Sequence, residues 1–177
     1  MIKGLKPSRY IPLLFALILI ASSGLSQTPP GNTPGNNEAK KEADPKTVYK
    51  TVCGQCHMAY PPHFLPSASW LKILEGEENH FGTPLDLAPQ TKSILVQFLS
   101  EGGADKSDTR MADKIMSSLD ENEIPLRITE VPYIKNKHRK ISAEVLQRKS
   151  IGSLANCNAC HRKAAEWSFS KWVTIPD

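Results

Sequence analysis

The 177-residue sequence predicts a mostly α-helical fold of short helices and long loops. Apolar side chains recur at helical spacing in several short stretches, as with Ile94, Leu95 and Phe98. No stretch shows the sustained alternation of apolar and polar residues that marks a half-buried strand. A five-residue motif that occurs twice indicates that these helices surround bound groups.

The repeated motif is C-x-x-C-H, which occurs at 53–57 (CGQCH) and at 157–161 (CNACH). It is the attachment signature of a c-type haem. Two thiols three positions apart lie on one helical turn, so each can form a thioether to a haem vinyl group. The histidine that follows can ligate the iron. We therefore predict two covalently bound haem c groups with the fold wrapped around them, attached through Cys53, Cys56, Cys157 and Cys160 and ligated by His57 and His161.

The cysteines allow two other interpretations. A C-x-x-C pair can form a redox disulfide, and two pairs can make a four-cysteine zinc site. Neither arrangement needs a histidine directly after the second cysteine, yet one follows in both motifs. The haem interpretation is therefore favoured.

Residues 1–26 have the features of a secretory signal peptide. Three basic residues precede an apolar run at 11–21, and Gly24 and Ser26 suit cleavage before Gln27. The run falls short of the roughly 20 residues of a membrane span, which makes an uncleaved anchor the less favoured alternative. Because thioether attachment occurs outside the cytoplasm in bacteria, we expect a soluble periplasmic protein.

The mature chain is expected to be nearly neutral. The precursor has 22 Lys and Arg and 18 Asp and Glu, and loss of the three basic residues of 1–26 leaves 19 against 18, a net charge of +1. This balance gives no case for nucleic-acid binding. The polar stretch 27–44 predicts a flexible leader, because it has no large apolar side chain to bury. Residues 45–177 then form one dihaem domain.

The first haem module is expected at about 45–100. Its helices are expected to begin at capping residues. The three prolines of 58–66 should forbid a helix there and force an extended or turning path. The expected caps are Asp44 for the helix leading to the first motif, Ser67 for one ending near Gly76, and Asp86 for one running from Leu87 to Ser100 and stopped by Gly102.

The second haem module is expected at about 125–177. Asp108 is the expected cap of a connecting helix through Leu119, and 120–127 is a connection. Further helices should begin at Thr129 and Ser142 before the second motif. Aromatic residues in the tail should pack on the haem or the core: Trp167, Phe169 and Trp172.

The second axial ligand of each iron decides whether the iron can bind a substrate. The candidates are His63, His80, His138, Met58, Met111 and Met116. His80 lies 23 residues after His57, and His138 lies 23 residues before His161, which is enough chain to wrap one porphyrin. Met111 and Met116 lie among apolar residues at helical spacing and are better explained by core packing. The spacing favours bis-histidine ligation and low potentials, with His63 spare.

The chain resembles the bacterial dihaem cytochrome c family of soluble periplasmic electron carriers. The resemblance covers most of the mature chain and depends on CGQCHMAYPP at 53–62, SASW at 67–70, HFG at 80–82, HRKI at 138–141 and ANCNACH at 155–161. It implies that His57 and His80 ligate the first iron and His138 and His161 the second. It also implies a membrane b-type cytochrome as electron donor and a monohaem cytochrome as acceptor.

An electron carrier is thus the expected function, with no catalytic residues. The alternatives are a haem subunit of a periplasmic reductase and a peroxidase-like dihaem enzyme with one open iron. Four basic residues flank His138 and form either a docking patch for an acidic partner or a solvated face: Lys135, Lys137, Arg139 and Lys140.

Overall fold

The fold is helical in this computed structural model, which describes residues 43–169 and 173–177. Within those residues no strand forms, and the fold class expected from the sequence is confirmed. No helix there combines the length and the apolar character needed to cross a bilayer. The α-helices are α1 (Pro45–Cys53), α2 (Ser67–Glu75), α3 (Pro89–Glu101), α4 (Arg110–Met116), α5 (Pro132–His138), α6 (Ala143–Leu146) and α7 (Cys157–Cys160). Short 3₁₀ helices join them: η1 (Pro62–Phe64), η2 (Glu77–Asn79), η3 (Ala104–Lys106), η4 (Ile128–Glu130) and η5 (Ala164–Glu166).

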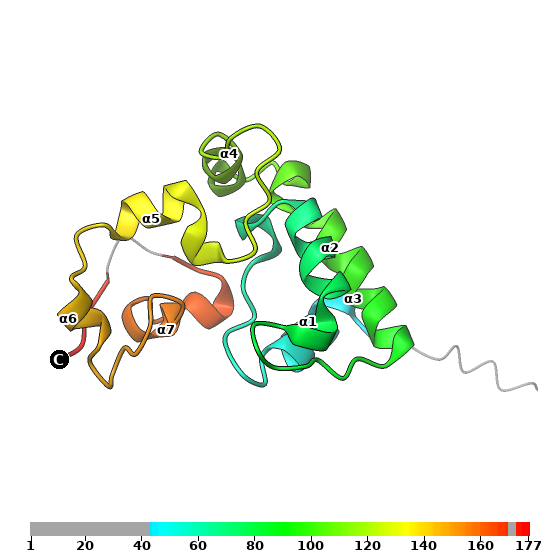
Figure 1. Ribbon diagram of the computed structural model, residues 1–177, viewed down its shortest axis with the longest axis horizontal. Helices are drawn as coiled ribbons and strands as arrows, with labels where there is room; N and C mark the ends of the chain where they lie inside the picture. Colours follow the sequence, from blue (N-terminus) through cyan, green and yellow to red (C-terminus); the bar gives the residue numbers. More distant parts are fainter. Residues whose placement is uncertain (1–42, 170–172) are drawn as a thin grey trace, which may run out of the picture. The chain divides into compact units, whose positions relative to one another are not determined.

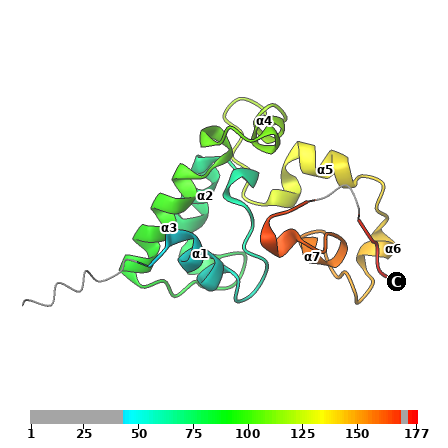
Figure 2. The same ribbon diagram turned by 180° about the vertical axis from the view of Figure 1, so that it is seen from behind.

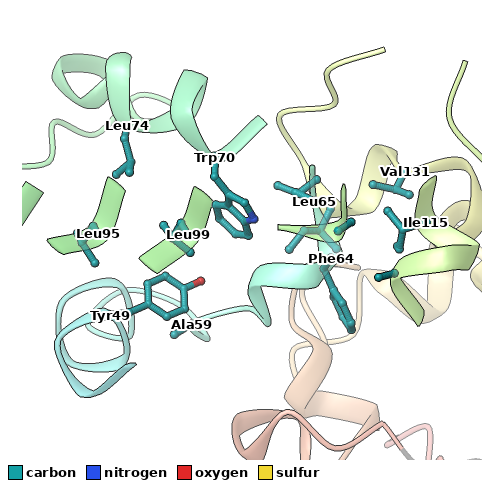
Figure 3. Packing of buried hydrophobic residues seen from close by; sticks show 13 residues of the cluster. Tyr49, Ala59, Phe64, Leu65, Trp70, Leu74, Leu95, Leu99, Ile115 and Val131 are labelled. Carbon is teal, nitrogen blue, oxygen red and sulfur yellow. The ribbon is translucent and has the colours of Figure 1, made fainter. Parts of the chain in front are cut away.

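Helices α1, α2 and α3 pack against one another and form the main apolar core (Figures 1 and 2). Tyr49 of α1 meets Trp70 of α2 edge-on, with ring centroids 6.4 Å apart. Leu95 and Leu99 lie one helical turn apart on α3 and face the same core (Figure 3). The side chains of these residues are almost fully buried, so this part of the chain has a protein core of its own.

The segment 58–66 after the first motif is held in place by hydrogen bonds from aromatic side chains. Trp167 Nε1 donates a hydrogen bond to the Ala59 carbonyl (2.7 Å), and the Tyr49 hydroxyl donates to the Tyr60 carbonyl (2.7 Å). Trp70 Nε1 donates to the Pro62 carbonyl (2.6 Å). These bonds satisfy carbonyls that the prolines prevent from entering a regular helix. We call this segment the strap.

The strap follows the extended and turning path expected from its sequence, but the expectation that its prolines forbid a helix is wrong at one turn. Its first part is extended, and Pro62–Phe64 forms the 3₁₀ helix η1, with Pro62 at the first position. Proline is compatible with the first turn of a helix, because the first N–H groups have no partner within it. The three prolines therefore allow a single tight turn.

Several expected helix caps are also corrected. The Thr109 hydroxyl, not the Asp108 carboxylate, caps α4 by accepting from Ala112 N (3.2 Å). Helix α3 begins at Pro89, with no cap from Asp86, and α5 begins at Pro132 rather than near Thr129. The residue before a proline disfavours helical backbone, which sets both starts. Asp44 and Ser142 cap α1 and α6 as expected.

Ser67 is the first residue of α2 rather than its cap. The Asp105 carboxylate accepts from Ser67 N (2.6 Å) and from the Ser67 hydroxyl (2.7 Å). The neighbouring Gly103 packs so closely on Ser67 that a Cβ there would lie 2.6 Å from the Ser67 nitrogen. The N-terminus of α2 is thus capped from 38 residues away in sequence.

Helices α5, α6 and α7 surround a cavity rather than a packed core. Ile134 of α5, Val145 of α6 and Cys157 of α7 all line it. Figure 1 shows these helices grouped apart from α1 to α3. The described residues, 43–169 and 173–177, belong to one compact unit. The expected signal peptide, nearly all of the leader 27–44 and Trp172 lie outside the described residues.

Candidate functional site

The first C-x-x-C-H motif lies at the end of α1. Cys53 is the last residue of the helix, and Gly54 is its C-cap. A Cβ at Gly54 would collide with the Lys50 carbonyl oxygen, so only glycine fits at this position. The chain then turns sharply enough to present Cys56 and His57 beyond the helix end.

His57 and His80 form the first histidine pair. Their ring centroids are 6.1 Å apart, and the ring planes are inclined by only 22°. His57 Nδ1 lies 2.8 Å from the Met58 carbonyl oxygen, which can only accept, so this nitrogen carries the proton. Its Nε2 is therefore free to bind a metal ion.

His80 is positioned by a tight turn after η2. Thr83 N donates to the His80 carbonyl (3.1 Å), and Gly82 N donates to Asn79 Oδ1 (2.9 Å). Phe81 has a positive φ of 52°, and its ring stacks beneath the Arg127 guanidinium at 3.9 Å. Residues 79–83 thus fix His80 opposite His57.

His138 and His161 form the second pair. Their ring centroids are also 6.1 Å apart, but the planes are inclined by 74°. His138 ends α5, and its Nδ1 donates to the Ile134 carbonyl one turn earlier (2.8 Å). His161 directly follows α7. The two pairs share their spacing and differ in their relative ring orientation.

Both pairs fit a metal ion held between two imidazoles. Two metal–nitrogen bonds of about 2 Å, together with the radii of the two rings, span about the observed separation. A cavity of about 650 Å³ with mostly apolar walls adjoins the second pair, and Cys157, Cys160, His138 and His161 all line it. Its volume lies in the range of cofactor sites. The donor set, the thiols and the cavity together suit a porphyrin at this site.

The protonation states suit metal binding by neutral imidazole. Burial, with smaller contributions from His57 and Arg127, lowers the pKa of His80. Burial, with a smaller contribution from His138, lowers the pKa of His161. Both rings are therefore neutral at pH 7, as a metal ligand must be.

The thiols lack the character of a redox dithiol. Burial raises the pKa of Cys53 to about 11 and the pKa of Cys157 to about 11. Reactive C-x-x-C motifs have lowered thiol pKa values instead. In the described part of the chain, no three histidine, cysteine or acidic side chains gather to hold a metal ion, so the cysteine pairs do not form the four-cysteine arrangement.

The other ligand candidates lie elsewhere. His63 is in η1, where its ring meets Phe64 edge-on at 5.3 Å, and burial lowers its pKa. Met116 packs against the main core. Met111 does so too and also lines the second cavity. Neither His63 nor these methionines take the place of His80 or His138 in the two histidine pairs.

Contacts between the two motifs were not apparent from the sequence. Tyr60 stacks on the His57 ring at 5.2 Å, and its hydroxyl donates to the Ala155 carbonyl (2.9 Å), two residues before Cys157. An open pocket of about 390 Å³ is lined by Cys56 and His57 of the first motif and by Asn158 of the second. The two attachment segments are therefore neighbours.

Aromatic contacts add a second connection. Phe169 lies 4.9 Å from Phe64 of the strap and 5.4 Å from the His161 ring, measured between centroids. The expected packing of Trp167 and Phe169 on the core is confirmed. Nothing in the local sequence indicates that Phe169 meets Phe64 or that Trp167 meets Ala59, because both contacts join segments about 100 residues apart.

Comparisons with known proteins agree with this architecture. A family model described as dihaem cytochrome c matches residues 49–169. The diheme cytochrome c from Rhodobacter sphaeroides superposes with a TM-score of 0.62 and 33% identity, over 71% of this chain and 95% of that one. A diheme cytochrome c from Shewanella baltica OS155 superposes with a TM-score of 0.61 and 29% identity, over 75% of this chain and 94% of that one.

No curated protein sequence matches the chain. The family match nevertheless covers more than half of its length, and both motifs lie inside it. The resemblance and the two cofactors inferred from the sequence are confirmed. The chain belongs to the dihaem cytochrome c family, whose members bind two haem c groups covalently and serve as haem-based electron carriers.

Proposed function

We propose that this protein carries electrons through two bis-histidine sites, with His57 and His80 on the first iron and His138 and His161 on the second. The supporting observation is the spacing of the two histidine pairs, 6.1 Å between ring centroids in each. With an imidazole on both faces, neither iron can bind a substrate. The role requires no acid, base or nucleophile.

When bound, each haem supplies a reversible one-electron couple at its iron. The carbonyls of Met58 and Ile134 hold the Nδ1 protons of His57 and His138. This fixes the tautomer and increases the donor strength of Nε2. Histidine in place of a methionine ligand gives a lower potential. The four histidines therefore favour two low-potential centres.

Electron exchange between the two sites is supported by their closeness. Cys56, His57 and Asn158 line one pocket, and Tyr60 contacts both His57 and the segment that leads to Cys157. Two haems held by these residues would lie close enough to exchange electrons.

Partner docking is supported by an uneven charge distribution. Residues 125–177 have ten Lys and Arg against four Asp and Glu, a net charge of +6. Residues 45–124 have seven against eleven, a net charge of −4. These opposite charges nearly cancel, so the net charge of the mature chain does not reveal the asymmetry. The exposed side chains beside His138 suit an acidic partner at the second haem: Lys135, Lys137, Arg139 and Lys140.

The proposed partners follow the family resemblance, with a membrane b-type cytochrome as donor and a monohaem cytochrome as acceptor. The N-terminal segment 1–26 supports export to the periplasm. Rates of electron transfer to an acidic acceptor should fall as ionic strength rises, because salt screens the basic patch. A rate that does not change with salt would argue against docking there.

Carbon monoxide tests the proposed ligation directly. The gas binds only a reduced iron with an open or displaceable position. The optical spectrum of the reduced holoprotein should therefore stay unchanged when carbon monoxide is added. A shift of the Soret band would instead indicate an open site and favour a dihaem enzyme.

A further inference from the structure

Tyr60 belongs to the strap of the first module but also lines the cavity of the second. Its ring stacks on the ring of His57, with centroids 5.2 Å apart and planes inclined by 26°. Its hydroxyl donates to the Ala155 carbonyl at 2.9 Å. One side chain therefore joins an iron ligand of the first site to the attachment segment of the second.

The position of Tyr60 is held at three points. Its backbone carbonyl accepts from the buried Tyr49 hydroxyl (2.7 Å), its hydroxyl is bound to Ala155, and its face rests on His57. These three contacts leave the Tyr60 ring little freedom to turn away from His57.

The stacked ring limits the rotation of His57. A ligand imidazole can turn about its metal–nitrogen bond, which changes the angle between the two ligand planes. Here the His57 plane is nearly parallel both to Tyr60 (26°) and to His80 (22°). Turning His57 toward a perpendicular arrangement would break its stack on Tyr60 and its Nδ1 hydrogen bond to Met58.

Within the described residues, no aromatic ring stacks on either histidine of the second pair. His138 has a comparable Nδ1 hydrogen bond, to Ile134, but Phe169 beside His161 is tilted by 60° rather than stacked. The planes of His138 and His161 are inclined by 74°. A parallel arrangement thus occurs at the site where a stacked tyrosine contacts the ligand.

We propose that Tyr60 is a positioning residue that holds the His57 ring parallel to His80 from an anchor in the second haem module. This inference rests on the proposed bis-histidine ligation of the first iron and adds what fixes its geometry. The electronic structure of the first iron site would then depend on the contact of Tyr60 with the second haem module.

The angle between ligand planes can be read by electron paramagnetic resonance of the oxidised holoprotein. Parallel imidazoles donate into the same iron d orbital and split the d-orbital pair, which gives a rhombic low-spin signal. Perpendicular imidazoles donate into both orbitals and leave the pair nearly degenerate, which gives a strongly anisotropic signal. The wild-type protein should show one signal of each kind in equal amounts.

Tyr60→Leu should remove the rhombic signal from most molecules and leave the anisotropic signal of the second site unchanged. Tyr60→Phe keeps the ring but loses the bond to Ala155, so it should broaden the rhombic signal. Trp167→Phe is the matched control, because it removes another hydrogen bond to the strap, at Ala59, without touching His57. The rhombic signal should survive in that control.

If the rhombic signal of Tyr60→Phe were the same as that of the wild-type protein, the proposal would be overturned. If Tyr60→Leu does not take up both haems, Tyr60→Phe alone provides the test. An equal change in Trp167→Phe would also overturn it, since general loosening would then explain the result. Failure of the proposed ligation looks different. A high-spin signal in the wild-type protein would show that an iron lacks its second histidine, whatever Tyr60 does.

Discussion

The two haem modules differ in what fills their interiors. In 45–100, Tyr49, Leu95 and Leu99 are at most 2% exposed and pack against other protein side chains. In 125–177, Ile128 and Val131 join that same core. Ile151 and Ala164 are the buried apolar residues outside it, within the described part of the chain. Most other apolar side chains of this module line a cavity of about 650 Å³: Ile134, Ile141, Val145, Leu146, Leu154, Phe169, Val173 and Ile175.

This difference indicates that the second module needs its haem as the apolar surface on which its side chains pack. Helices of four to seven residues, such as α5, α6 and α7, are too short to be stable alone. They need an apolar surface on which to pack, and a porphyrin bound in the cavity would supply one. The first module can fold around α1, α2 and α3 before its haem contributes.

The largest expected effect is loss of the second module when its haem cannot attach. Cys157→Ser combined with Cys160→Ser should halve the haem absorbance and unfold 125–177, while α1 to α3 stay folded. Amide hydrogen exchange, resolved by segment, measures this. Cys53→Ser with Cys56→Ser is the matched control and should leave the α1–α3 core protected. Equal loss of protection in both modules would contradict the comparison.

A leucine-to-alanine substitution in the core of the first module should lower the free energy of unfolding more than the same substitution at the wall of the second module's cavity. Leu99→Ala should destabilise the holoprotein by about 2–5 kcal/mol, because Leu99 is fully buried against protein. Leu154→Ala should cost less, because Leu154 is only half-buried. Denaturant unfolding followed by far-ultraviolet circular dichroism gives both values.

The Leu99→Ala and Leu154→Ala variants also allow a sharper test. In the Cys157→Ser/Cys160→Ser background, the cost of Leu154→Ala should vanish, since its partner in the cavity is gone. The cost of Leu99→Ala should remain. A persistent effect of Leu154 would mean that the second module has a protein core after all.

Replacement of one distal histidine should change one centre only. His80→Met and His138→Met should each raise one potential, by a fraction of the roughly 0.8 V range that axial ligands span. Potentiometry with optical detection separates the two centres. If His80→Met altered neither centre, His80 would not be a ligand.

The smallest expected effect concerns the distant cap of α2. Burial alone would raise the pKa of Asp105, but hydrogen bonds from the Ser67 N–H and hydroxyl outweigh it and hold the pKa below its ordinary value. A carboxyl whose pKa is lowered in the folded state stabilises the fold at pH values above its pKa in the unfolded chain. That stabilisation is lost as the pH falls through the pKa of the folded state. Asp105→Asn should cost about 1 kcal/mol at pH 7.

The cost of Asp105→Asn should shrink as the pH falls below about 4, where the wild-type carboxyl takes up its proton. Thermal unfolding of both proteins between pH 3 and pH 7, a range chosen to bracket the titration, checks this. A constant difference across the range would show that the carboxylate charge is not what caps the helix.

The features that the sequence predicted are those encoded over short distances. Two thiols and a histidine within five residues define each attachment site, and Asp44 before Pro45 marks the start of α1. The two histidine spacings of 23 residues paired His57 with His80 and His138 with His161, and the structure brings both pairs to 6.1 Å.

What the sequence could not predict depends on contacts between distant segments. Asp105 caps a helix that starts 38 residues earlier, and Trp167 reaches Ala59 across 108 residues. Such partners follow from the packing of whole elements, which no local pattern encodes. The inclination of the histidine planes is equally inaccessible, because it is set by neighbours such as Tyr60.

The three aromatic donors on the strap have a consequence for the rate of electron transfer. A site exchanges electrons quickly when its surroundings barely rearrange as the metal changes oxidation state. Trp167, Tyr49 and Trp70 donate hydrogen bonds to three carbonyls of the strap that follows His57, so the backbone there has little freedom to respond. A haem ligated by His57 would therefore lie against a well-held segment of backbone, which favours a low reorganisation energy.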